Sequence, residues 1–334
     1  MEKEKANNML AIITIIVILL LILGISVLAY ILISEQKVDN NEKIRAQNVN
    51  LEKVENNTPQ EKTKFTMTEA EFPKVDGATA MLPMVGEITK AVLGYTDAQA
   101  EKYLEDNTQG KSAKVYASLI SKEKDLIFVS EPSDDILRQA REANVEFDNT
   151  GIGLDGFVFL LNKENPVQSL TLDQIRKIYK GEITNWKEVG GDDAQIYPYQ
   201  REANSGSQNL MEKMVMKGQK MAEPKSTDLR IESMSGLIDA VSNGDNSKYA
   251  IGYSIYLYAK EQYVKDSTKF LKINGVEAND KNISNQTYPL TKIVYAVTRK
   301  DVPQDSNVRK LIKWLLTEDG QKVVVAGGYV PLNK

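Results

Sequence analysis

The stretch QIYPYQREANSGSQNLMEKMV, residues 195–215, combines a short strand, a polar loop and the beginning of a helix. Arg201 ends the strand, and Ser205, Gly206 and Ser207 stand where the helix begins. Serine is a preferred N-cap residue, so the loop could simply cap a surface helix. The N–H groups and the dipole at a helix start also attract negative charge, so the same residues could hold an anion. The stretch alone leaves both interpretations open.

Strands and helices alternate on both sides of this stretch. Apolar runs predict strands at residues 125–130, 155–166 and 291–303, residues 250–260 mix small and aromatic residues, and helical periodicity predicts helices at 112–124, at 170–181 and from 306 onward. This alternation predicts an α/β fold with mostly parallel strands, in which ligands bind beyond the carboxyl ends of the strands.

Two of the predicted strands resemble each other. GFVFLLNKENP (156–166) and KIVYAVTRKDVP (292–303) both run from apolar through polar and basic residues to proline. They fit two crossovers between two lobes, one out and one back, although two ordinary strands could also look alike by coincidence.

The N-terminal segment predicts a membrane anchor. Residues 9–33 are uncharged and almost wholly apolar, and as a helix they would extend about 37 Å, more than a bilayer core requires. No shorter apolar core with a small-residue cleavage site is evident, which favours a retained anchor over a cleaved signal peptide. Lysines flank both sides, but the short tail 1–8 favours a cytoplasmic N-terminus. Residues 34–72 are polar and predict a tether between the anchor and an extracytoplasmic domain.

The composition excludes several functions. The 334 residues are 42% hydrophobic and 26% charged, as in ordinary globular proteins, and the net charge of −4 argues against general affinity for nucleic acid. The chain has no Cys and no His, which excludes disulfides, thiolate metal sites and Ser-His catalysis. A hydrolase with Ser205 or Ser207 as nucleophile also lacks the Gly-x-Ser-x-Gly motif. We therefore expect neither an enzyme nor a bound cofactor or metal ion.

Three loops in the sequence join small hydroxyl residues to a helix start. They lie in DGATAMLPMVGEITKAV (76–92), in NTQGKSAKVYASLI (107–120) and in the opening stretch. Each offers backbone N–H donors and a hydroxyl, and Arg201 adds one full positive charge with a forked geometry. Each loop alone could be a simple cap. Together in one α/β frame they predict an anion site.

Glu131 follows the predicted strand 125–130, at the end where ligands bind. An ionised carboxylate only accepts hydrogen bonds, so it would favour an anion that carries a proton, such as hydrogen phosphate, over fully ionised sulfate. The alternative is an ordinary surface residue that precedes the helix beginning near Pro132.

The motifs DGATAMLP, DLIFVSEPSDD, IRKIYKGEITNWKEVGGDDAQIYPYQREANSGSQNLMEKMV and AGGYVPL resemble those of the phosphate-binding proteins of ABC-type phosphate importers, over about residues 73–334. The resemblance implies a two-lobed periplasmic-binding-protein-like (type II) fold that closes on phosphate at the hinge. It assigns phosphate contacts to Thr79, the Ala80 amide, Ser112, Glu131, Arg201, Ser205, Gly206 and Ser207.

The same resemblance implies an organisation and a set of partners. Lobe 1 would comprise residues 73–156 and 294–334, and lobe 2 residues 157–293. The expected protein is a membrane-anchored, extracytoplasmic, monomeric receptor that delivers inorganic phosphate to an ABC permease and its ATPase. A surface sensor or adhesion-like module that binds phosphate without feeding a permease is the alternative.

The chain also departs from the family pattern. Ser207 replaces the usual threonine, and Glu131 stands where an aspartate is common. The loop before Ser112 contains Lys111 and is poorer in glycine, and the lipid-bearing cysteine of many relatives is missing.

Overall fold

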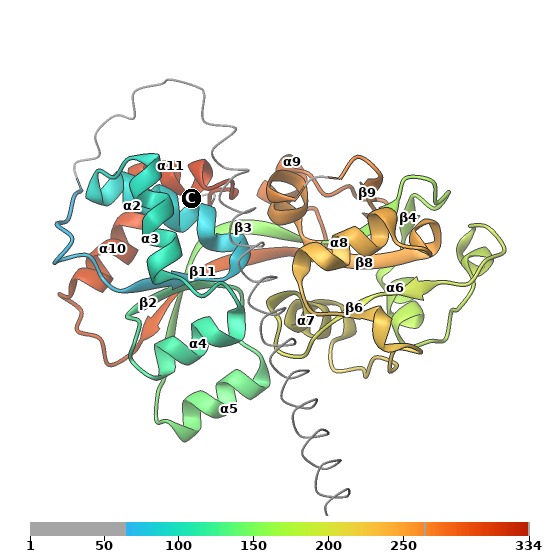
Figure 1. The fold of residues 1–334 in the computed structure, drawn as a ribbon, viewed down its shortest axis with the longest axis horizontal. Coiled ribbons are helices and arrows are strands. Elements are labelled where there is room, and N and C mark those ends of the chain that lie inside the picture. Colours follow the sequence, from blue (N-terminus) through green and yellow to red (C-terminus); the bar gives the residue numbers. More distant parts are fainter. Residues whose placement is uncertain (1–64, 264, 333–334) are drawn as a thin grey trace, which may run out of the picture. The chain divides into compact units, whose positions relative to one another are not determined.

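The computed structural model describes residues 65–263 and 265–332. Two antiparallel strands, β3 and β11, form the centre of this part of the chain (Figure 1). They belong to a seven-stranded sheet with the order β1-β2-β11-β3-β8-β5, in which β9 also pairs with β3. Its strands are β1 (Val75–Gly77), β2 (Leu126–Val129), β3 (Phe147–Asn162), β5 (Tyr197–Pro198), β8 (Ala250–Ile255), β9 (Thr268–Phe270) and β11 (Thr291–Arg299). Two small parallel sheets pair β4 (Ser169–Leu170) with β10 (Lys272–Ile273), and β6 (Gln200–Arg201) with β7 (Arg230–Ile231).

The prediction of mostly parallel strands is wrong for the central sheet. Only β1 with β2 and β5 with β8 pair in parallel, whereas β11 is antiparallel to β2 and β3, and β3 is antiparallel to β8 and β9. Helices lie between the partners of both parallel pairs, as parallel pairing requires, but they also lie between the antiparallel partners β3 and β8. The strands suggested as crossovers lie in β3 and β11, which run in opposite directions, one out and one back.

The strand β3 begins eight residues before the predicted strand. Its first half contains Gly151 and Gly153, which weaken a strand by propensity. Pairing with β11 nevertheless extends from Phe147 to Gly156, with one irregularity. A Cβ atom on Gly153 would lie 2.9 Å from Val324, so this glycine allows the C-terminal helix to pack directly on the strand.

Helices cover the sheet (Figure 1). They are α2 (Leu82–Leu93), α3 (Asp97–Asn107), α4 (Ser112–Ile120), α5 (Asp134–Glu142), α6 (Leu172–Tyr179), α7 (Gly206–Leu210), α8 (Met234–Asn243), α9 (Asp280–Ser284), α10 (Asn307–Leu315) and α11 (Glu318–Ala326). Short 3₁₀ turns are η1 (Thr79–Met81), η2 (Trp186–Val189), η4 (Thr227–Leu229) and η5 (Ser247–Tyr249), and π-helical turns are η3 (Met211–Met216) and η6 (Tyr258–Gln262).

Two hydrophobic clusters define the two lobes. The first lobe is built around side chains of α2, α4, β2, α10 and α11, and the second around those of β3, α6, α8 and β8. Both tryptophans are buried as core residues, Trp186 in the second cluster and Trp314 in the first. The predicted two-lobed α/β fold is therefore confirmed, while the predicted lobe boundaries stay a prediction.

The predicted cytoplasmic tail and membrane anchor (1–33) lie outside the described residues, as does most of the predicted tether. Among residues 65–263 and 265–332, no helix has the length and apolar composition that a membrane crossing requires. The described end of the tether packs on the first lobe: Phe65 stacks on Trp314 with 5.2 Å between ring centroids, and the Met67 N–H donates to the Val92 carbonyl at 3.0 Å. Folded structure thus begins before residue 73.

Candidate anion-binding site

The two loops of the first lobe that precede helices are joined to each other. The Thr79 N–H and hydroxyl both donate to the Gly110 carbonyl, at 2.6 and 3.0 Å, and Ala78 forms a parallel bridge with Gly110. Gly110 has φ +81°, a conformation that favours glycine. This contact places the start of η1, with Thr79 and Ala80, beside the start of α4, with Ser112.

A buried carboxylate that sequence reasoning missed holds the same loops. Asp76 is fully buried in β1, and its Oδ1 accepts hydrogen bonds from the N–H groups of Gly77 at 2.7 Å and Gln109 at 3.0 Å. A carboxylate directly before the Gly77-Ala78-Thr79 loop is a feature of the sequence that could have indicated this role. Asp76 therefore holds both loops through their backbone N–H groups, and it is a positioning residue in the first lobe.

We expect Asp76→Ala to lower the free energy of unfolding by about 2–4 kcal/mol, since two N–H groups in the protein interior lose their acceptor. Urea denaturation of the full-length chain in detergent measures this change. Asp106→Ala is the matched control: Asp106 forms an exposed ion pair with Lys102 at 3.0 Å, and its loss should cost less than about 0.5 kcal/mol. Equal effects of the two substitutions would contradict the assigned role.

In the second lobe, Arg201 is buried, with 7% of its surface exposed. Its Nε donates to the Ile231 carbonyl at 3.1 Å, its Nη2 to the Glu232 carbonyl at 2.6 Å, and its Nη1 to the Ser207 hydroxyl at 3.2 Å. Three directional contacts hold the guanidinium in one orientation. A fixed, partly desolvated fork is the geometry that recognises oxyanions.

The start of α7 lies beside Arg201. Ser205 caps this helix by accepting a hydrogen bond from the Gln208 N–H at 3.3 Å, and Ser207 is fully buried. A Cβ atom on Gly206 would lie 2.8 Å from the Ser112 hydroxyl. The helix starts of the two lobes therefore meet at Gly206 and Ser112, as expected for one site made from both lobes.

Tyr253 anchors the arginine from behind. The Arg201 N–H donates to the Tyr253 hydroxyl at 2.9 Å, and this hydroxyl donates in turn to the Gln208 carboxamide oxygen. Burial raises the pKa of Tyr253, so the hydroxyl keeps the proton that it donates. The Tyr253 hydroxyl therefore links Arg201 to α7.

Glu131 stands apart from the other predicted site residues. Half of its side chain is exposed (51%), and its carboxylate lies 3.4 Å from the Tyr295 hydroxyl and 3.9 Å from the Lys213 ammonium. Lys213 comes from the second lobe and also donates to the Pro132 carbonyl at 2.6 Å. Glu131 therefore lies where the lobes touch, at a more exposed position than Arg201 or Ser207.

A buried ion pair lies close behind Glu131 on the two central strands. Lys292 of β11 faces Asp155 of β3 at 3.5 Å, and its ammonium is also 3.5 Å from the Ser130 hydroxyl. Burial lowers the pKa of Lys292 and raises the pKa of Asp155, while the attraction between them opposes both shifts. The pair thus links the strands that join the lobes to the residue before Glu131.

Tyr329, in the AGGYVPL motif, reaches the first loop. Its hydroxyl donates to the Ala80 carbonyl at 2.5 Å, which fixes the backbone at the start of η1. The C-terminal segment also bridges Leu154 of β3 through Val330. The motif therefore has a positioning role that the sequence did not reveal.

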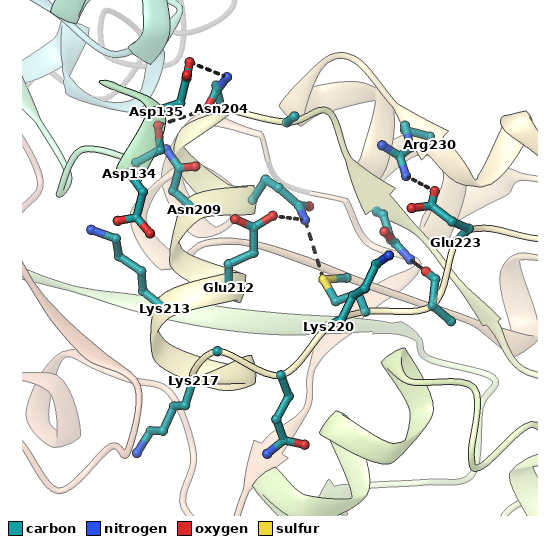
Figure 2. Close-up of a pocket in the computed structure, with 18 residues that line it drawn as sticks. Asp134, Asp135, Asn204, Asn209, Glu212, Lys213, Lys217, Lys220, Glu223 and Arg230 are labelled. Atoms are coloured by element: carbon teal, nitrogen blue, oxygen red, sulfur yellow. Dashed lines mark hydrogen bonds and ion pairs between the residues drawn. The ribbon is translucent and has the colours of Figure 1, made fainter. Parts of the chain in front are cut away.

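A hollow of about 690 Å³ lies beside α7 and η3, next to the start of α5 (Figure 2). Its charged lining residues balance: Asp134, Asp135, Glu212 and Glu223 against Lys213, Lys217, Lys220 and Arg230. A neutral balance does not favour an anion, so the helix starts remain the candidate site. In the described part of the chain, no group of three or more acidic side chains is arranged to hold a metal ion.

Comparison with known proteins defines the class. Residues 56–319 match the family model of the PBP superfamily domain, and the chain belongs to that superfamily. It is 28% identical over 289 residues to the phosphate-binding protein PstS of Pseudomonas aeruginosa (78% of this chain, 86% of that protein). It is 26% identical over 268 residues to PstS of Bacillus subtilis (78% and 80%).

A solved structure agrees with these relatives. The chain aligns, with a TM-score of 0.58 and 26% identity, to a Clostridium perfringens protein described as a phosphate ABC transporter substrate-binding protein and crystallised with bound phosphate. The alignment covers 78% of this chain and 98% of that one. The resemblance to phosphate-binding proteins that the sequence motifs predict is confirmed.

Proposed function

We propose that this protein captures inorganic phosphate between its two lobes and delivers it to an ABC importer. The observation that carries the proposal is the meeting of two helix starts, at Ser112 and Gly206, beside the buried and fixed guanidinium of Arg201. The named relatives, all phosphate-binding proteins, support the same ligand.

In this proposal the ligand is held without covalent chemistry. Arg201 supplies the full positive charge, and the helix starts of α4 and α7 supply N–H groups and the positive ends of their dipoles. Ser112, Ser205 and Ser207 supply hydroxyl donors. The Ser205 hydroxyl accepts from the Gln208 N–H, so its own proton can turn to the ligand.

Thr79 and Ala80 take part mainly through their backbone. Both donors of Thr79 point at the Gly110 carbonyl, so a phosphate contact from its hydroxyl requires that this hydrogen bond be shared or exchanged. Glu131, at the exposed side of the site, would accept a hydrogen bond from the O–H of hydrogen phosphate.

Hinge closure would occur on β3 and β11, which pass between the hydrophobic clusters. Lobe boundaries at 156/157 and 293/294 fall within these strands, as a hinge requires. We further propose that residues 9–33 anchor the chain in the membrane, with the folded lobes extracytoplasmic and monomeric, where an ABC permease can accept the phosphate.

Calorimetric titration of the full-length chain in detergent with phosphate, sulfate, arsenate and molybdate tests the ligand. We expect tight binding of phosphate and much weaker binding of sulfate. Tight binding of another oxyanion without heat on adding phosphate would refute the proposal.

A further inference from the structure

An ion pair joins the two lobes next to the candidate site. Lys111, the residue before α4 in the first lobe, places its Nζ 2.6 Å from Oε1 of Glu232, which follows β7 in the second lobe. Each side chain is about one-third exposed (32%). A lysine at a helix start opposes the helix dipole, and the carboxylate from the other lobe offsets this unfavourable charge.

Glu232 also contacts the arginine that the proposed function places on the ligand. Its backbone carbonyl accepts from Arg201 Nη2 at 2.6 Å, and the neighbouring Ile231 carbonyl accepts from Nε at 3.1 Å. The side chain of one residue therefore holds the opposite lobe, and its main chain holds the guanidinium. The contact with Lys111 and the contact with Arg201 are thus made by the same residue.

We infer that Glu232 is a positioning residue that couples lobe closure to the orientation of Arg201, with Lys111 as its partner across the lobes. The inference rests on the proposed phosphate site. Separation of the lobes breaks the ion pair and leaves the segment of the Glu232 carbonyl held only by contacts of its own lobe, such as the pairing of β7 with β6. Closure restores the ion pair, so the arginine is best oriented for the anion when the lobes meet.

The direction in which one substitution changes phosphate affinity distinguishes this positioning role from a simple effect of charge. Glu232 places a negative charge near an anion site, so its removal would tighten phosphate binding if charge alone mattered. If the residue acts as a coupling element, Glu232→Gln weakens binding instead. Lys111→Met weakens binding under either view, and therefore the pair of substitutions is needed.

The test measures phosphate affinity by calorimetry on the full-length chain in detergent, for Glu232→Gln, Lys111→Met and the double variant. We expect each single variant to bind phosphate about three- to tenfold more weakly than the unmodified chain. The double variant should bind at least as tightly as the single variant with the lower affinity. Lys187→Met is the matched control, because Lys187 pairs with Asp193 at 3.0 Å within the second lobe, and it should leave the affinity unchanged.

A second readout reports closure without phosphate. The chain has no native cysteine, so spin labels at Glu105→Cys in the first lobe and Lys272→Cys in the second give the distance between the lobes. Glu232→Gln should shift this distribution toward longer distances, whereas Lys187→Met should not.

Two results would overturn the inference: unchanged or tighter phosphate binding by Glu232→Gln, or additive losses in the double variant. Failure of the unmodified chain to bind phosphate would instead refute the proposed function. In that case the distance measurement still decides whether Lys111 and Glu232 hold the lobes together. An unchanged distance distribution in Glu232→Gln would refute this contact between the lobes.

Discussion

Replacing Arg201 with alanine is expected to weaken phosphate binding at least about 100-fold while the lobes remain folded. The substitution removes the full positive charge and the fork that fit an oxyanion, and charge-assisted hydrogen bonds of this kind contribute about 1.5–3 kcal/mol each. Calorimetric titration gives the affinity, and circular dichroism of the same samples reports the fold. Arg201→Lys should fall in between, because it keeps the charge and loses the fork.

Arg230→Ala is the control for this experiment. Arg230 lies on the neighbouring strand β7, pairs with the exposed Glu223 at 2.9 Å and is itself 40% exposed. Its replacement should change phosphate affinity by less than about threefold. Comparable losses for Arg201→Ala and Arg230→Ala would mean that general positive charge, rather than the fixed guanidinium, binds the ligand.

Several strands and helices could be predicted from the sequence, but the direction of the central strands could not. Apolar runs locate β2 and β11 because buried strands need them, whereas the mixed small and aromatic residues of β8 did not indicate a strand. The first half of β3 contains glycines and polar residues, and it is a strand only because β11, more than 130 residues later, pairs with it. Local propensity carries no information about such a distant partner.

Some residues of the candidate site could likewise be predicted from the sequence, and others could not. Ser112, Ser205 and Ser207 could be found because hydroxyl residues at helix starts have a local signature. Tyr253 and Glu232 have none. Tyr253 lies in a strand and matters because its hydroxyl meets the Arg201 N–H, and Glu232 matters because of Lys111 in the other lobe. These roles exist only after the chain has folded.

The second large effect is expected from Glu131→Gln, as a change in selectivity. An ionised carboxylate accepts a hydrogen bond from the O–H of hydrogen phosphate and repels sulfate, which has no proton to donate. A glutamine amide can donate to either anion. We expect phosphate affinity to fall about 10-fold or more and sulfate affinity to rise, so that the preference for phosphate drops by about two orders of magnitude. Competitive titration of sulfate against phosphate measures the ratio.

The exposed position of Glu131 makes this prediction demanding. Its carboxylate contacts Tyr295 and Lys213, and a ligand proton would have to compete with these groups. Tyr295→Phe removes the first contact and keeps the carboxylate, so it serves as the control and should preserve selectivity. If Glu131→Gln leaves the phosphate-to-sulfate ratio unchanged, the carboxylate does not read the ligand's proton. Its place would then be with Lys213, as part of the contact between the lobes.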